Sequence, residues 1–366
     1  MVDVKRQYLQ HKKEIDQAVL EVMESGQFIN GPAVHQLAED MQTYLGAKYA
    51  IPCASGTDAL QLALMALDIG PGDEVITTPF TFVATAETIA ILGARPVYVD
   101  IEEKTFNLDP SQIESAITPK TKAIIPVHLY GQSVDMDPIM ELAEKKGLAV
   151  IEDAAQAVGE RYKGKKVCSL GNLGCISFFP SKNLGAYGDA GMVVTNSDQL
   201  ADKVKMIANH GSRKRYYHDL LGVNSRLDTI QAAILRVKLN YLDQWNDQRR
   251  KNAHYYSELL SPLGVVTPFI AEYADHIFHQ YTIQLEQKRD ELHQFLNEKN
   301  IPNAIYYPIP LHLQDAYIKT SGYKKGDFPI SERMSERVIS LPMHPDLNRE
   351  EQEYIVENIK NFLNSN

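Results

Sequence analysis

The segment SFFPSKNLGAYGDAG, residues 177–191, holds a lysine that could do chemistry. Lys182 follows a run of β-forming residues, and glycines follow it at positions 185, 188 and 191. Glycine permits a tight backbone that approaches a ligand closely. The lysine could be a nucleophile, a phosphate ligand or a solvated side chain. Taken alone, the segment favours the solvated alternative, because most lysines lie at the surface.

A second segment, IEDAAQAVG at residues 151–159, carries an acid and an amide. Asp153 ends an apolar run, and Gln156 lies three residues later. On a turn or a short helix this spacing places both side chains on one side. A carboxylate at the end of a strand in an α/β sheet suits a protonated ring nitrogen. It would equally suit a helix N-cap, since Asp precedes Ala-Ala-Gln.

The third segment, ASGTDALQLAL at residues 54–64, resembles the start of a helix directly after a strand. Free amides at Gly56 and Thr57, together with the helix dipole, would bind a phosphate. The segment matches neither a Walker loop nor GxGxxG, so it does not indicate a nucleotide-binding fold. An ordinary capped helix is the alternative, and the segment by itself favours it.

Together the three segments supply what pyridoxal 5'-phosphate (PLP) requires, namely a lysine, an acid for the ring nitrogen and a phosphate-binding helix start. The acid precedes the lysine by 29 positions (182 − 153). With these motifs the sequence resembles the DegT–StrS family of PLP-dependent nucleotide-sugar aminotransferases of fold-type I. The resemblance covers nearly the whole chain. It runs through GQFINGPAV, ASGTDAL, GDEVITTPFTFVATA, PVYVDI, VHLYGQ, EDAAQA, SFFPSK, GVNSRLDTIQAAIL, YYPIPLH and SLPMHP.

The resemblance implies a cofactor role for each matching residue. Lys182 would hold PLP as a Schiff base, Asp153 would pair with the pyridinium nitrogen, and Gln156 would bond near the phenolic oxygen. An acid at the ring nitrogen keeps it protonated, so that the ring can draw electrons from the substrate.

The phosphate would be bound by Gly56, Thr57 and Ser177, and the aromatic ring of Phe82 would stack on the cofactor. Asn224 matches a residue that reaches the phosphate from the neighbouring subunit. The resemblance therefore implies a homodimer with shared active sites.

Substrate contacts are expected from residues spread along the chain, namely Asn30, Gly31, Arg226, Tyr306, Tyr307 and His312. Arg226 could bind the carboxylate of the amino donor or of a uronate sugar, because arginine binds carboxylates bidentately. An intersubunit salt bridge is the alternative. Two details depart from the family pattern: Ala190 replaces a glycine of Gly-Asp-Gly-Gly, and Tyr306 stands where close relatives often carry histidine.

The implied reaction transfers an amino group from L-glutamate to a keto-sugar nucleotide in two half-reactions. The motifs resemble C3 aminotransferases most closely, which favours UDP-2-acetamido-2-deoxy-3-oxo-glucuronate and bacterial surface polysaccharide (O-antigen) synthesis. A dTDP-3-oxo-6-deoxyhexose enzyme and a C4 enzyme are the rivals. A PLP-dependent sugar dehydratase would carry histidine in place of Lys182. A non-catalytic regulatory relative would be expected to lose the lysine, the acid or the glutamine.

These residues need elements to position them, and the chain alternates β-rich runs with amphipathic stretches. The runs are YAIP, EVITT, PVYVD, KAIIPV, LAVIED, CISFF and GMVVT, with helical patterns at 57–67, 83–92 and 138–146. This alternation predicts an α/β fold with a mostly parallel seven-stranded sheet covered on both faces. Residues 224–260 predict a connecting helix, bent or straight, before a smaller α+β domain with strands at FHQYTIQL and AIYYP. The predicted domains are 1–240 and 241–366.

Composition narrows the class of protein further. A formal net charge of −10 argues against nucleic acid or an anionic membrane as the main partner. The basic aromatic run at 212–217 favours a loop that meets a nucleotide diphosphate or a neighbouring subunit, with a solvated loop as the alternative. The three cysteines form no CxxC pair, and the sequence shows no signal peptide and no apolar run of membrane-spanning length. We therefore expect a cytoplasmic protein that contacts neither nucleic acid nor membrane and binds no metal.

Overall fold

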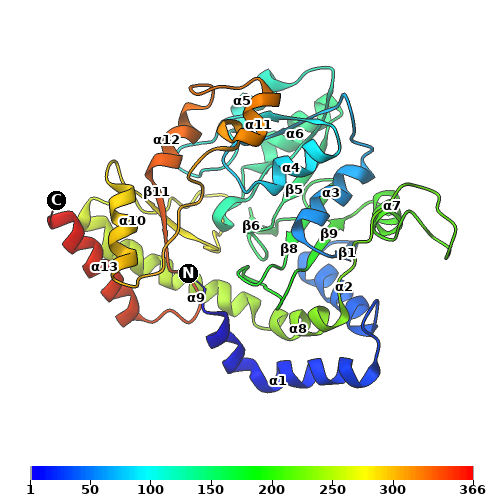
Figure 1. Ribbon diagram of the computed structural model, residues 1–366, viewed down its shortest axis with the longest axis horizontal. Coiled ribbons are helices and arrows are strands. Elements are labelled where there is room, and N and C mark those ends of the chain that lie inside the picture. The colour runs from blue at the N-terminus through cyan, green and yellow to red at the C-terminus, as the bar shows by residue number, and fades with distance from the viewer. Residues whose placement is uncertain (1, 366) are drawn as a thin grey trace.

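A seven-stranded sheet forms the centre of the protein, seen in a computed structural model that describes residues 2–365 (Figure 1). The strand order is β1-β9-β8-β5-β4-β2-β3. The pairs β2/β3, β2/β4, β4/β5 and β5/β8 are parallel, whereas β9 runs antiparallel to β8 and β1. The predicted mostly parallel sheet is thus confirmed. The strands are β1 Tyr49–Cys53, β2 Glu74–Thr77, β3 Arg95–Tyr98, β4 Thr121–Ile124, β5 Ala149–Asp153, β8 Leu173–Ser177 and β9 Gly191–Thr195.

Helices cover both faces of this sheet, because its strands carry apolar side chains on both sides. Val75 of β2 packs into a core with α3, α4 and α7, whereas the next residue, Ile76, faces a second core with α2, α6 and α8. The covering elements are α3 Gly56–Ala66, α4 Ala84–Ile91, α5 Pro110–Ala116, α6 Met136–Lys146 and α7 Asp198–Ala208. Short elements lie between them, namely η1 Leu129–Gly131, β6 Arg161–Tyr162 and β7 Lys165–Lys166.

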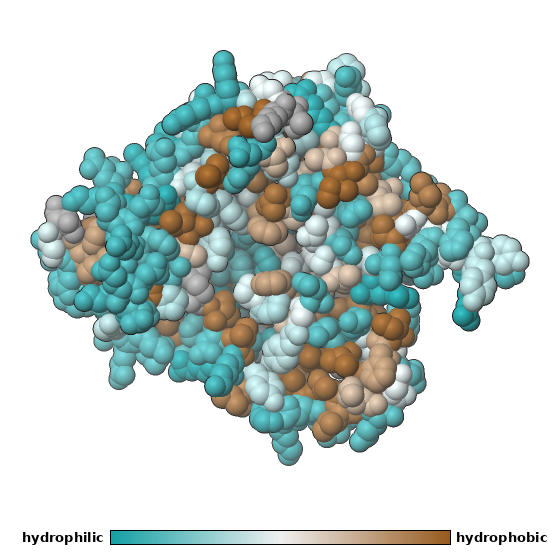
Figure 2. All heavy atoms as spheres, in the orientation of Figure 1, coloured by the Kyte–Doolittle hydropathy of each residue, from teal (hydrophilic) through white to brown (hydrophobic). Residues whose placement is uncertain are grey.

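Two helices precede the sheet, α1 Val4–Ser25 and α2 Pro32–Leu45, and the sequence patterns did not predict them. The buried residues of α1 are Gln7, Ile15 and Val22. α1 packs along α8, and α2 lies between α8 and β1. On the face in Figure 2, apolar side chains gather in the region of these helices. The exposed ones at this end include Leu20, Met23, Phe28 and Ile29.

The predicted connector is present as two helices, α8 Thr229–Leu239 and α9 Leu242–Leu260, so helix begins at 229 and not at 224 and is interrupted at residues 240 and 241. After it, β10 Tyr281–Gln284 pairs antiparallel with β11 Val338–Leu341, while the run AIYYP forms only an isolated bridge at Ala304. That second strand prediction is therefore wrong: pairing stops after Ala304, and Pro308, which has no amide hydrogen to donate, ends the run. The remaining elements are η2 Ser261–Leu263, α10 Arg289–Glu298, η3 Leu311–Leu313, α11 Asp315–Ser321, α12 Pro329–Arg337 and α13 Arg349–Asn364.

The C-terminal part has a core of its own, formed by residues between 253 and 362. The exact division at 240/241 stays a prediction. The two parts are joined where Asp100 accepts hydrogen bonds from the backbone amides of Ile330 and Ser331, each at 2.9 Å, at the start of α12. Among residues 2–365, no helix combines the length and the apolar character that crossing a membrane requires.

Candidate active site

A cavity of about 700 Å³ lies beyond the carboxyl ends of the central strands, where Asp153 ends β5 and Ser177 ends β8. Residues 279–314 of the C-terminal part close its other side. The cavity brings together nine of the residues that the sequence predicted, namely Gly56, Thr57, Phe82, Asp153, Gln156, Ser177, Lys182, Tyr306 and Tyr307. Ligands in open α/β sheets bind at this place.

Lys182 stands in the turn that joins β8 to β9. Two backbone bonds close this turn: the amide of Lys182 donates to the carbonyl of Phe179 at 2.8 Å, and that of Ala186 donates to Phe178 at 2.7 Å. Burial lowers the pKa of the Lys182 amine to about 8, and the nearby Asp153 carboxylate opposes that shift. A lysine with a lowered pKa is more often neutral near pH 7, and the neutral amine is the nucleophilic form.

Asp153 points into the cavity from the end of β5 and is held by two donors. The Thr85 hydroxyl, on α4, donates to one carboxylate oxygen at 2.8 Å, and the amide of Ala155 donates to the other at 3.1 Å. Burial raises the pKa of Asp153, and these two hydrogen bonds oppose the rise. Residues 154–158 form turns and no helix, so the N-cap alternative for Asp153 is wrong. The arrangement suits a buried carboxylate that faces a cationic ring nitrogen.

Gln156 lies beside Asp153 and has a fixed amide orientation. Its Oε1 accepts from the backbone amide of Tyr130 at 2.8 Å, and its Nε2 donates to the Tyr307 hydroxyl at 3.1 Å. An amide nitrogen carries two hydrogens, so one remains for a ligand oxygen. The side chain can therefore donate into the cavity beside the acid.

The other end of the cavity is the start of α3. Ser55 caps this helix by accepting from the amide of Asp58 at 3.0 Å. The first amides of a helix have no partner within it, so those of Gly56 and Thr57 can bind an anion. A Cβ atom on Gly56 would lie 2.6 Å from the Cβ of Ser177. Only glycine therefore allows the helix start to pack against Ser177, and the two segments form one anion-binding corner.

Five predicted residues lie outside this cavity. Asn30 and Arg226 line a separate hollow of about 420 Å³ beside α2, and Asn224 is exposed. The amide of Gly31 donates to the Thr229 hydroxyl at 3.1 Å. The side chain of His312 is fully buried, with its Nε2 3.0 Å from a carboxylate oxygen of Glu332. Their substrate and cofactor roles stay predictions.

The sequence patterns missed Thr85, His279 and Gln280. Thr85 lies three residues after Phe82 in the predicted helix start, so helical spacing from Phe82 could have indicated it. His279 and Gln280 line the cavity from the segment before β10. No local signal in the sequence links that segment to a site about 100 residues earlier.

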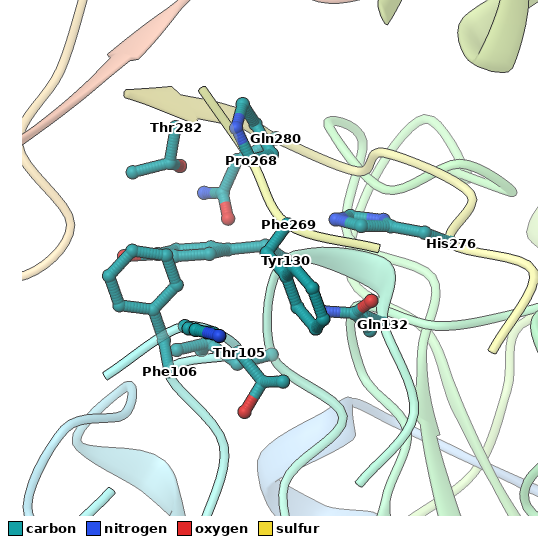
Figure 3. Close-up of a pocket in the computed structure, with 11 residues that line it drawn as sticks. Thr105, Phe106, Tyr130, Gln132, Pro268, Phe269, His276, Gln280 and Thr282 are labelled. Atoms are coloured by element: carbon teal, nitrogen blue, oxygen red, sulfur yellow. The ribbon is translucent and has the colours of Figure 1, made fainter. Parts of the chain in front are cut away.

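A very small cavity of about 10 Å³ lies behind the site, and Gln280 lines both cavities. Figure 3 shows Gln280 and Thr282 reaching toward the rings of Phe106 and Tyr130. Burial lowers the pKa of His276, at its edge, to about 3, so this imidazole is neutral at physiological pH. A space of this size holds about one water molecule. It is therefore packing behind Tyr130 and not a second ligand site.

The donor set of the large cavity fits PLP. The start of α3 can bind its phosphate, and the buried Asp153 carboxylate can pair with its protonated ring nitrogen. The Gln156 amide can donate to its phenolic oxygen, and the Lys182 amine can react with its aldehyde. Residues 2–365 contain no group of histidine, cysteine and acidic side chains arranged to hold a metal ion. Fold and site together define a PLP-dependent enzyme of fold-type I.

The chain belongs to the DegT/DnrJ/EryC1/StrS aminotransferase family, whose model matches residues 9–360. It is 49% identical to the UDP-2-acetamido-2-deoxy-3-oxo-D-glucuronate aminotransferase of Pseudomonas aeruginosa, over 94% of this chain and 95% of that protein. It is 54% identical to a protein of Geobacillus stearothermophilus named pleiotropic regulatory protein, over 99% of this chain and 98% of that protein. The crystal structure of DesV from S. venezuelae in complex with a ketimine intermediate superimposes with a TM-score of 0.96 at 40% identity. The superposition covers 99% of this chain and 97% of the DesV chain. The protein is thus a PLP-dependent sugar aminotransferase.

Proposed function

We propose that this cavity binds PLP through Lys182, Asp153, Gln156 and the corner formed by Gly56, Thr57 and Ser177. The observation that carries the proposal is the convergence of a half-buried amine, a buried acid and a free helix start on one cavity. Phe82, a residue that is 55% exposed at the rim, is available to cover the ring of the cofactor. The three buried thiols suit a reducing cytoplasm, where we place the protein.

When bound, the cofactor stores the amino group between two half-reactions and draws electrons from the breaking Cα–H bond. The residues of this chain bind, orient and move protons. The Lys182 amine takes the proton from Cα of L-glutamate as 2-oxoglutarate forms, and it returns a proton to the sugar carbon that receives the amino group. Asp153 keeps the ring nitrogen protonated throughout. Tyr307 and Tyr130 hold the Gln156 amide in place.

For the substrate we propose a UDP-linked 3-oxo-uronate, UDP-2-acetamido-2-deoxy-3-oxo-glucuronate, in bacterial surface polysaccharide (O-antigen) synthesis. The relative from Pseudomonas aeruginosa supports this choice. Arg226 is a cation suited to a carboxylate and lies outside the cavity of its own chain, so in the proposed dimer it would serve the site of the second copy. Arg213 and Lys214 belong to a loop that extends from the body after α7 (Figure 1). That loop suits a nucleotide diphosphate.

A homodimer with shared sites belongs to the same proposal. The exposed apolar side chains Leu20, Met23, Phe28 and Ile29 give α1 and the segment after it a surface suited to a second copy. Asn224 is exposed outside the cavity of its own chain, as a residue that serves the neighbouring site would be.

The test offers a panel of 3-keto and 4-keto nucleotide sugars to the holoenzyme with L-glutamate, and product masses are read by mass spectrometry. We expect an amino sugar from the UDP-3-oxo-uronate. Lys182→Ala should form none and should lose the long-wavelength absorbance of the lysine-bound cofactor. Turnover with 4-keto sugars alone would overturn the proposed 3-oxo-uronate substrate. An active Lys182→Ala variant would overturn the proposed role of Lys182 in the active site.

The name of the Geobacillus relative favours a second candidate function, a regulatory one. A regulator without catalysis would not need Lys182, Asp153 and Gln156 to converge on one cavity, and in this chain they do. An absorbance change of the holoenzyme on adding L-glutamate separates the two functions, since a purely regulatory protein would show none.

A further inference from the structure

A buried lysine of α8 lies behind the turn that carries Lys182. The side chain of Lys238 is only 1% exposed, and its Nζ donates to the backbone carbonyl of Gly185. The same Nζ lies 4.8 Å from the centre of the Tyr187 ring. Within residues 2–365, no carboxylate forms an ion pair with it, and burial is the one cause of its pKa shift. In the described part of the chain, that carbonyl and that ring are the contacts of its amine, so burial of its charged form is costly and lowers its pKa.

Gln231, seven residues earlier on α8, holds the next part of the same turn. Its Oε1 accepts from the backbone amide of Tyr187 at 2.8 Å, and its Nε2 donates to the carbonyl of Tyr187 at 3.3 Å. From one face of α8, the two side chains therefore bind the backbone of residues 185 and 187.

The turn that they hold is tightly wound. A Cβ atom on Gly185 would lie 2.4 Å from the carbonyl oxygen of Pro180, so the chain folds back on itself around Lys182. The carbonyl of Gly185, which Lys238 binds, lies at the closing end of this turn. Burial lowers the pKa of Lys238 to about 7, and its neutral amine would still donate to a carbonyl.

We propose that Lys238, together with Gln231, is a positioning residue for Lys182. It holds the turn of residues 179–187 closed and thereby fixes where the amine enters the cavity. Lys238 takes no part in the chemistry itself. This inference rests on the proposed role of Lys182 as the residue that holds the cofactor.

We call the contacts of Lys238 and Gln231 with residues 185 and 187 the clamp. It can be tested by hydrogen exchange and mass spectrometry on the cofactor-free protein. In Lys238→Met, a change of similar length without the charge, we expect exchange in residues 179–187 to rise about tenfold or more, since the turn opens more often. The matched control is Lys251→Met, which removes an exposed lysine of α9. Exchange in β10 should stay at the wild-type level in both variants.

The second readout is the dissociation constant for PLP, from absorbance titration of the same proteins. We expect about tenfold weaker binding for Lys238→Met and no change for Lys251→Met. Unchanged exchange in residues 179–187 would overturn the clamp. Looser exchange with unchanged PLP binding would overturn its positioning role.

Should Lys238→Met fail to fold, Gln231→Leu decides, because it removes the two bonds to Tyr187 and leaves the buried amine of Lys238 in place. It should loosen the same residues, and unaltered exchange in it would overturn the proposal. Failure of the proposed function is a separate result. It would appear as retained activity in Lys182→Ala, whatever the exchange data show.

Discussion

One of the two donors that hold the acid of the site is a hydroxyl from another element. Asp153 is buried, which disfavours its charged form, and Thr85 offsets that effect by donating a hydrogen bond at 2.8 Å. Hydrogen bonds to a charged group contribute about 1.5–3 kcal/mol. Thr85 is therefore expected to matter for activity although it bears no charge and transfers no proton.

Thr85→Val should lower the rate of amino transfer about tenfold, since 1.4 kcal/mol corresponds to a factor of ten. Removing the donor raises the pKa of Asp153 further, so less of it is ionised at low pH. The loss should accordingly be larger near pH 6 than near pH 9 in rate measurements across that range. Thr88→Val is the matched control, because Thr88 is buried on the same helix and donates to the carbonyl of Ala84 at 2.9 Å. Equal losses in both variants would refute this role.

At the scale of elements, the phosphate corner exists only because two distant segments touch. The start of α3 and the end of β8 meet at Gly56 and Ser177, 121 positions apart (177 − 56). Any side chain at position 56 must push these segments apart. The corner is therefore as sensitive to packing as to the chemistry of its donors.

Gly56→Ala should weaken PLP binding about tenfold or more and lower the free energy of unfolding by about 1–3 kcal/mol, as overpacking does. Titration of the cofactor-free protein and denaturant unfolding measure the two effects. Gly70→Ala serves as the control, since a Cβ there would meet nothing within 4 Å. Wild-type affinity in Gly56→Ala would show that the close contact with Ser177 is unimportant.

Local patterns in the sequence predicted the sheet, whereas the cofactor roles of single residues came from the combination of three motifs and from the family resemblance. Each strand is a short apolar run, and Lys182, Asp153 and Gly56 each lie at or near the end of one. Contacts across the fold could not be predicted in this way. Thr85 reaches Asp153 across 68 positions, and the clamp from Lys238 to Gly185 spans 53. α1 was missed although it carries many apolar residues; several of them, such as Leu20 and Met23, are exposed, so apolar residues alone do not mark its buried face.

For the whole molecule, the proposed dimer predicts that each active site draws on two chains. A variant that lacks Lys182 and a variant that lacks Asn224 should each be inactive or weak alone. In a mixed dimer, one of the two sites receives Lys182 from one chain and Asn224 from the other, so it is intact.

Mixing equal amounts of Lys182→Ala and Asn224→Ala under conditions of subunit exchange should therefore restore about a quarter of wild-type activity. Half of the dimers are mixed, and each of those has one working site. Activity assays before and after exchange measure the gain, and light scattering reports the mass of the assembly. Activity that stays at the sum of the two separate variants would argue against shared sites.

The antiparallel pairing of β8 and β9 has a consequence for how the amine and the acid keep their separation. Both ends of the turn that holds Lys182 belong to hydrogen-bonded neighbouring strands, and Asp153 ends the strand next to β8. The ends of β5, β8 and β9 are therefore separated by the distance between neighbouring strands, about 4.8 Å each. Backbone hydrogen bonds set this distance, whatever the side chains are. The ladder thus fixes the strand ends from which the acid and the lysine segment start, whereas the final position of the amine also depends on the contacts of α8 with residues 185 and 187.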